Sequence, residues 1–262
     1  MFNKTPSLKQ KIKVAKLAHK LGTAQEALHP RFGGTYIRDL VYGANDGIVT
    51  TFAVVAGAFG ANLSSNVVLI LGFSNLFADG LAMALGNYLG TKSEIQYAQS
   101  EKDIEAWEIT HIPEEEKQEI RNIYKAKGFT GKDLDKAVQI ITSDNDRWAN
   151  EMMIAEHGLL PFDSKAPFKN GIATFTAFSL AGLMPLTPYL LGAIYPHLTF
   201  PSFHYSLIMA AISLFVVGSL RTLITKKSWF RSGIEMLFVG TLAATTAFFV
   251  GYFIDHTLSA IK

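Results

Sequence analysis

The sequence predicts an all-α membrane protein with five transmembrane helices and an acidic helical domain inserted between the second and third. Three long stretches carry no charged side chain, namely residues 47–78, 170–220 and 236–254. The acidic residues gather instead in one segment, 92–169, whose pattern is helical. Because a bilayer core takes about 20 predominantly apolar residues per helix, the uncharged stretches are long enough to cross a membrane.

Breaks within these stretches divide them into spans. The first stretch is interrupted at 62–66, and the second at 195–203, where two prolines mark a turn. The alternative is a large soluble helical protein, but a soluble core seldom needs 51 residues without one charge. The predicted spans are 40–61, 67–90, 171–194, 203–223 and 234–254.

Composition excludes several other classes of protein. Charged residues make up 18% of the chain, below the roughly 25% of soluble domains, and hydrophobic residues make up 49%. This composition excludes disorder, collagen and coiled coil. The absence of cysteine excludes disulfides, thiolate nucleophiles and cysteine-based metal centres. No phosphate-binding glycine loop or nucleophile elbow is present, and we expect no nucleic-acid partner and no enzymatic activity.

Lysine and arginine predict the orientation in the membrane. Residues 1–38 carry eight basic residues against one acid, and the loop after the fourth span is also basic. The loops at 62–66 and 195–203 carry no Lys or Arg. Positively charged flanks stay in the cytoplasm, so we expect the N-terminus and 92–169 to be cytoplasmic. The predicted domains are the basic segment 1–38, spans 39–91, the insert 92–169, and spans with a short tail 170–262.

Within the basic segment, residues 8–21 have a partly apolar side. This segment is compatible with an interfacial helix on the membrane surface and equally with a solvated basic helix.

The sequence pattern of the acidic insert predicts four helical segments. It holds 16 of the 22 acidic residues and 11 basic ones, a net charge of 11 − 16 = −5. The first segment continues the second span to 109, and Pro113 starts the next at its first turn. Asp144 is a good N-cap and Gly158 a helix stop. The other predicted helices are 113–127, 130–141 and 144–157.

Carboxylates and thioethers share faces of these helices. Glutamates at 101, 105 and 108 follow i, i+4, i+7 spacing, and two more are three residues apart on the next helix. A cation would turn their mutual repulsion into attraction, and thioethers beside them favour a first-row divalent metal. The alternative to a metal site is a solvated glutamate face with methionines in the core. The position of His157 indicates a histidine at a helix end. The candidate metal ligands are Glu105, Glu108, Glu116, Glu119, Met152, Met153 and Glu156.

Polar residues also fall inside the first two spans, where ionisable groups are costly and are functional candidates. On the second span they recur every four residues and form a slanting stripe on one side of the helix. Interhelical hydrogen bonding explains asparagine well, but an unpartnered buried aspartate less well. The candidate pathway residues are Asn45, Asp46, Asn75, Asp79, Met83 and Asn87.

Several segments together resemble the vacuolar iron transporter family. RDLVYGANDGIVTTFAVVAG (38–57) and ADGLAMALGNYLGTKSE (78–94) are similar to its first two spans, and IPEEEKQEI (112–120) and WANEMMIAEHGL (148–159) to its cytoplasmic metal-binding domain. GLMPLTPYLL (182–191) and GTLAATTAFFVG (240–251) are similar to its third and fifth spans.

The resemblance implies a five-span homodimer that exports Fe²⁺, often Mn²⁺ too, from the cytosol in exchange for protons. The metals are cargo, with no permanently bound cofactor, and other divalent first-row metals are expected to bind. The family's membrane site falls on Asp46 and Met83. Its cytoplasmic site falls on Glu105, Glu108, Glu116, Glu119, Glu156, Met152 and Met153.

One position departs from the family pattern. Many members carry a glutamate on the second span where this chain has Asn75, and Asp79 is the candidate for the missing carboxylate. The ending of the second span favours a bacterial member, hence an inner membrane, or a vacuolar membrane if the source is eukaryotic. Two other functions stay open on the residues alone: a membrane-tethered ferroxidase using the glutamates and His111, and a metal-sensing membrane protein without flux.

Overall fold

The computed structural model describes residues 12–13, 16–17, 20, 37–159, 163–195, 202–222 and 228–261. Within these ranges the chain is all-α, with eight helices of described bounds and no strand. Most of the segment 8–21, with its two alternative interpretations, lies outside the described residues.

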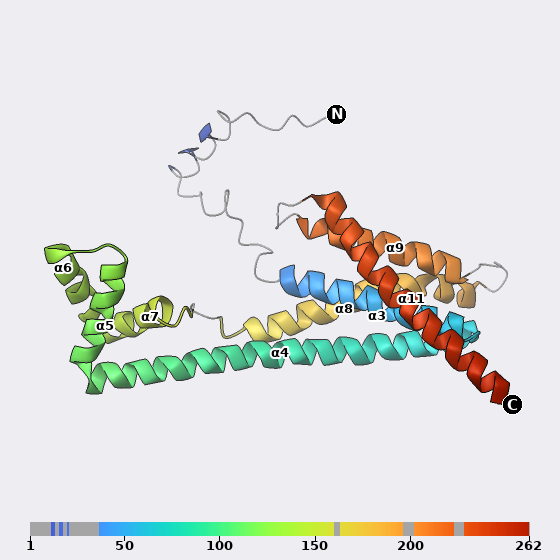
Figure 1. Cartoon of the computed structure of the whole chain (residues 1–262), viewed down its shortest axis with the longest axis horizontal. Helices are drawn as coiled ribbons and strands as arrows, with labels where there is room; N and C mark the ends of the chain where they lie inside the picture. Colours follow the sequence, from blue (N-terminus) through green and yellow to red (C-terminus); the bar gives the residue numbers. More distant parts are fainter. Residues whose placement is uncertain are drawn as a thin grey trace. The chain divides into compact units, whose positions relative to one another are not determined.

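Within the described ranges, five helices are long and apolar enough to cross a membrane, which confirms the predicted number of candidate spans. Figure 1 labels them along the chain. The last helix extends beyond its predicted span at both ends. The side of the membrane on which the insert lies, and the homodimer, stay predictions. The five helices are α3 (Ile37–Gly60), α4 (Ser65–His111), α8 (Ala166–Ile194), α9 (Ser202–Leu220) and α11 (Trp229–Ile261).

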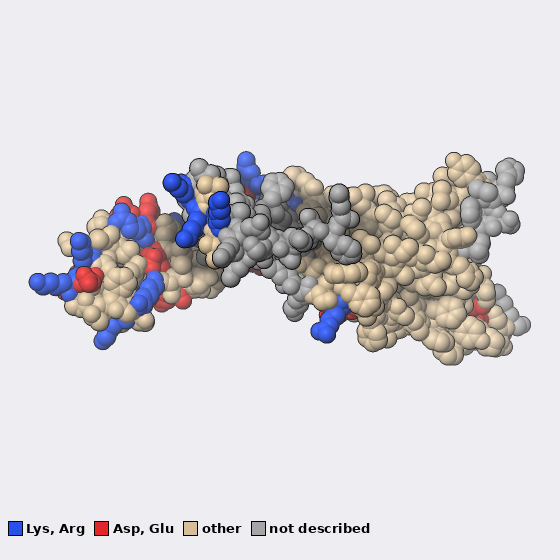
Figure 2. All heavy atoms as spheres, turned by 90° about the horizontal axis from the view of Figure 1, so that it is seen from above, with Lys and Arg blue, Asp and Glu red and all other residues tan. Residues whose placement is uncertain are grey.

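The chain divides into two compact units. The membrane unit comprises residues 1–85 and 170–262, and the insert unit comprises 86–169. Helix α4 contributes to both, since its 47 residues run without a break from the second span into the insert, as predicted. Figure 2 shows charged side chains gathered over the insert unit, whereas the described surface of the membrane unit carries few in that view.

Helix α3 supplies the centre of the membrane unit. Its apolar residues Ile48 and Val55 are completely buried, and they belong to a core that also includes Leu186 of α8 and Leu214 of α9. In a bilayer, such helices associate through close packing rather than through removal of apolar surface from water. The position of α3 therefore depends on how closely its neighbours can approach it.

Glycines bring the α3 backbone into contact with its neighbours. A Cβ placed on Gly43 would lie 2.7 Å from the Thr174 carbonyl oxygen of α8, and one on Gly47 would overlap the Phe178 carbonyl oxygen. Towards its other end, Gly60 meets the Phe248 backbone of α11 in the same way. These three glycines thus allow close packing of α3 against α8 and α11.

The insert unit folds around its own apolar core, which includes Ile109, Ile120, Trp148 and Met152. Its helices are α5 (Pro113–Ala126), α6 (Gly131–Thr142) and α7 (Asn145–Ala155), close to the predicted bounds. The predicted N-cap is confirmed, because the Asp144 side chain accepts a hydrogen bond from the Arg147 backbone amide at 2.8 Å. Gly158 adopts φ +68° after α7, the left-handed conformation that suits glycine at a helix end.

We expect Gly47→Ala to destabilise the protein, because the added methyl group would meet the backbone of α8 rather than a side chain that can move. Overpacking of this kind costs about 1–3 kcal/mol. The control is Gly86→Ala on α4, where a Cβ meets no atom within 4 Å. Thermal unfolding in detergent should give a lower midpoint for Gly47→Ala alone, and equal midpoints for the two variants would contradict the packing described.

Candidate metal sites

Three helices of the insert unit bring their carboxylates together. Glu105 and Glu108 lie on α4, Glu116 follows the proline that starts α5, and Glu156 and His157 lie at the end of α7. These residues form two groups of three. In each group, every residue offers one ligand atom, and the three ligand atoms all lie within 4.8 Å of one another. The groups are Glu105, Glu108 and Glu116, and Glu105, Glu156 and His157.

Two of these carboxyl groups are removed from water. Glu105 and Glu116 are each only 3% exposed, and the Oε2 atom of each has no hydrogen-bond partner among the described residues. Burying such an oxygen without a partner is costly, so nearly all buried polar atoms in proteins are paired. A cation held between these oxygens would supply the missing interaction. Two buried carboxylates with unpaired oxygens distinguish this cluster from an ordinary solvated glutamate face.

The same crowding changes the proton affinity of the cluster. Burial, with the added charges of Glu119, Glu105, Glu108 and Glu156, raises the pKa of Glu116 to about 7. Desolvation and the nearby Glu156 also raise the pKa of Glu119, while the His157 charge lowers it. Near neutral pH the metal-free cluster therefore holds protons that a divalent cation would have to displace.

His157 is the ligand-type residue that sequence reasoning missed. Its Nε2 atom lies 2.8 Å from Oε1 of Glu105, although 52 residues separate them. This hydrogen bond, supported by the charges of Glu105, Glu156 and Glu101, raises the pKa of His157 although burial opposes the shift. Its position beside Glu156 was the only sequence signal, and that signal equally fits a histidine at a helix end.

The two predicted thioether ligands are buried. Met152 has no exposed surface and packs in the apolar core of the insert unit, and Met153 is 7% exposed. Metal binding by these side chains stays a prediction, and Met152 already has a structural role in the core.

In the membrane unit, Asp46 of α3 and Asp79 of α4 are both half-buried and close enough for their charges to interact. Asn75 lies one turn before Asp79, and its Nδ2 atom is buried without a hydrogen-bond partner among the described residues. Met83 lies one turn after Asp79 and is also half-buried. The structure thus places two carboxylates from different helices within electrostatic reach of each other in the apolar part of the chain.

Asn45 and Asn87 lie elsewhere. Asn45 lines a cavity with Arg221 and Met236, beside α9 and α11, because consecutive residues on a helix point about 100° apart. Asn87 belongs to the insert unit, and its side chain accepts a hydrogen bond from Thr91. The polar stripe predicted for the second span therefore extends across the boundary between the units.

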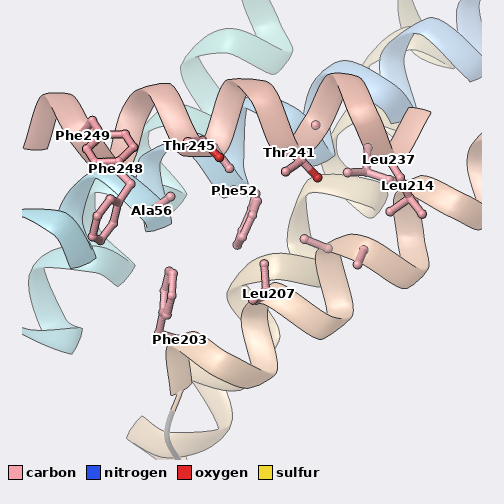
Figure 3. A pocket seen from close by; sticks show the side chains of 14 residues that line it. Phe52, Ala56, Phe203, Leu207, Leu214, Leu237, Thr241, Thr245, Phe248 and Phe249 are labelled. Carbon is pink, nitrogen blue, oxygen red and sulfur yellow. The ribbon is translucent and has the colours of Figure 1, made fainter. Parts of the chain in front are cut away.

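A second cavity in the membrane unit has a different character. It lies between α3, α9 and α11, has a volume of about 300 Å³, and is lined by Phe52, Phe203 and Phe248 (Figure 3). The only polar side chains lining it are the hydroxyls of Thr241 and Thr245.

Comparison with known proteins matches residues 37–252 to the model of the VIT family. The vacuolar iron transporter of Toxoplasma gondii is 33% identical, with 95% of this chain and 86% of the relative covered. The vacuolar iron transporter of Plasmodium berghei is 31% identical, covering 89% and 88%. Vacuolar iron transporter 1 of Arabidopsis thaliana is 31% identical, covering 85% and 88%.

We predict that the metal-free insert unit loses stability as pH rises from about 5 to about 7.5. Between the ordinary value of 4.5 and the raised pKa of about 7, Glu116 binds more protons in the folded than in the unfolded chain, so folding weakens with rising pH. The raised pKa of His157 acts in the same direction above its ordinary value of 6.5.

The measurement is hydrogen-exchange protection of α5 amides in the chelator-treated full-length protein, corrected for the intrinsic pH dependence of exchange. Glu116→Gln should flatten the pH profile, whereas Glu114→Gln, whose carboxylate is exposed and paired with Lys117, should keep it. Protection that rises with pH would contradict the described burial of Glu116.

Proposed function

Because the chain belongs to the VIT family, we propose that it is a membrane transporter that moves Fe²⁺, and Mn²⁺ as well, out of the cytosol in exchange for protons. Curated relatives of similar length are named vacuolar iron transporters, which supports iron as cargo. The observation that carries the proposal is the carboxylate pair of Asp46 and Asp79 on adjacent helices able to cross a membrane.

In this proposal, the pair holds the ion within the membrane. Two carboxylates balance the charge of a divalent cation, and Met83 adds a thioether that favours first-row metals over Ca²⁺ and Mg²⁺. Asp79 takes the place of the family's membrane glutamate, and Asn75 offers its amide beside it. When the cation leaves, the two carboxylates repel each other, so at least one takes up a proton. Metal and protons thereby compete for the same groups, which is the physical basis of exchange.

The insert unit captures the ion before it enters the membrane. Its carboxylates are graded in exposure: Glu119 and Glu156 are in contact with water, whereas Glu105 and Glu116 are buried. A hydrated cation meets the exposed oxygens first and exchanges its water for protein oxygens stepwise. Glu108, Met152 and Met153 complete the proposed set of ligands.

The basic flanks at 1–38 and 221–231 favour a cytoplasmic insert and export from the cytosol. We also propose a homodimer in a bacterial inner membrane, with the lipid bilayer and protons as the other partners.

We expect Asp46→Asn to lower uptake of Mn²⁺ or Fe²⁺ into proteoliposomes with an imposed pH gradient by at least about tenfold, as loss of one charge-bearing ligand removes over about 1.4 kcal/mol. The matched control is Asp255→Asn near the end of α11, whose carboxylate accepts a hydrogen bond from Asn62. Normal uptake by Asp46→Asn would refute this pathway. Oxidation of Fe²⁺ without uptake by the unmodified protein would favour the ferroxidase instead.

The double variant Glu116→Gln, Glu119→Gln should weaken divalent metal binding to the full-length protein several-fold, because it removes two of the converging carboxylates. Calorimetric titration measures the change. The control, Glu114→Gln with Glu115→Gln, removes the same charge from exposed positions of α5. If both double variants bind metal equally, the cluster does not have the proposed role in metal capture.

A further inference from the structure

The imidazole of His157 lies inside the glutamate cluster and is not among the ligands considered so far. Its Nε2 atom is 2.8 Å from Oε1 of Glu105, and ligand atoms of Glu105, Glu156 and His157 all lie within 4.8 Å of one another. That separation suits three atoms around a single cation. The hydrogen bond does not complete the site, since Oε2 of the 97%-buried Glu105 still has no partner among the described residues.

The backbone around His157 holds it in place. Its amide bonds the Met152 carbonyl oxygen at 3.4 Å, and the Leu159 amide bonds the Met153 carbonyl oxygen at 2.8 Å, closing the last turn of α7. Gly158, at φ +68°, permits this ending. The backbone of His157 is thus fixed at the C-terminal end of a helix, where the partial negative charge of the helix dipole favours a cation.

The chemistry of the two ligand groups differs. Glu105, Glu108 and Glu116 offer only carboxylate oxygens, which also suit Ca²⁺ and Mg²⁺. An imidazole nitrogen favours first-row transition metals, iron among them, over those cations. Resting on the function proposed above, we propose that His157 is a direct nitrogen ligand of the cargo ion in the insert unit, together with Glu105 and Glu156, and that it sets selectivity for Fe²⁺ over Ca²⁺ and Mg²⁺.

The test separates a ligand from a residue that only orients Glu105. In His157→Gln, the side-chain amide can still donate a hydrogen bond to Glu105 and offer an oxygen, but it has no nitrogen lone pair for a metal. The control is His111→Gln in the same unit, where the ring contacts the Trp107 carbonyl oxygen and is exposed. All proteins are full-length, with affinity tags removed, and thermal unfolding establishes that each variant is folded.

Substoichiometric Mn²⁺ is the spectroscopic probe. Electron spin echo envelope modulation should reveal coupling to ¹⁴N in the unmodified protein and in His111→Gln, and should lose it in His157→Gln. In anaerobic titrations, His157→Gln should bind Fe²⁺ about tenfold more weakly, with Ca²⁺ binding unchanged.

Three outcomes would overturn the inference. Mn²⁺ that binds without nitrogen coupling, or with coupling that survives in His157→Gln, would show that His157 is not a ligand while leaving the proposed capture role intact. Equal weakening of Fe²⁺ and Ca²⁺ binding would mean that His157 only positions Glu105. Failure of the unmodified protein to bind Mn²⁺ or Fe²⁺ at the insert unit would remove the proposed capture role as well.

Discussion

Negative charge held away from water is the constraint on which the rest of the molecule depends. In the insert unit, burial and mutual repulsion both oppose ionisation of Glu116, and Glu105 lies beside it with one oxygen unpaired. A fold keeps such groups together only if other interactions hold their helices in place. The apolar core around Ile120 and Met152 supplies those interactions, and Pro113 starts α5, so that Glu116 lies on a different helix from Glu105.

The membrane unit meets the same constraint by different means. Asp46 and Asp79 belong to helices whose glycines closely approach α8, because apolar burial drives association little within lipid. In both units, uncharged packing brings together carboxylates that would otherwise separate. A divalent cation is the partner that we propose for both sites.

The sequence predicts much of this architecture because the relevant physics is local. Absence of charge over a bilayer's length identifies the spans, and Pro113 and Asp144 identify helix starts through the backbone groups that they lack or satisfy. Helical spacing likewise places Glu105 and Glu108 within reach of each other. These features need no knowledge of which helix lies beside which.

Features that depend on tertiary contacts could not be predicted in this way. The approach of His157 to Glu105 joins positions 52 residues apart, and no periodicity encodes it. Spacing assigns Met152 to the side of Glu156, but packing against Ile109 and Trp148 decides that it lies in the core. Asn45 adjoins Asp46 in the chain, yet it lines a cavity with Arg221 because neighbouring helical positions diverge.

Helix α3 contacts the backbone of α8, whereas α4 contacts side chains of α8, and these two kinds of contact differ in how easily they can rearrange. Gly47 of α3 meets the backbone of α8, whereas Gly72 of α4 meets the side chain of Leu186, and Gly80 meets the ring of Phe175. A main-chain contact cannot relax without displacing a whole helix, but leucine and phenylalanine can change rotamer. The backbones of α3 and α8 are therefore held together directly, whereas α4 can shift against α8 through changes of side-chain rotamer alone.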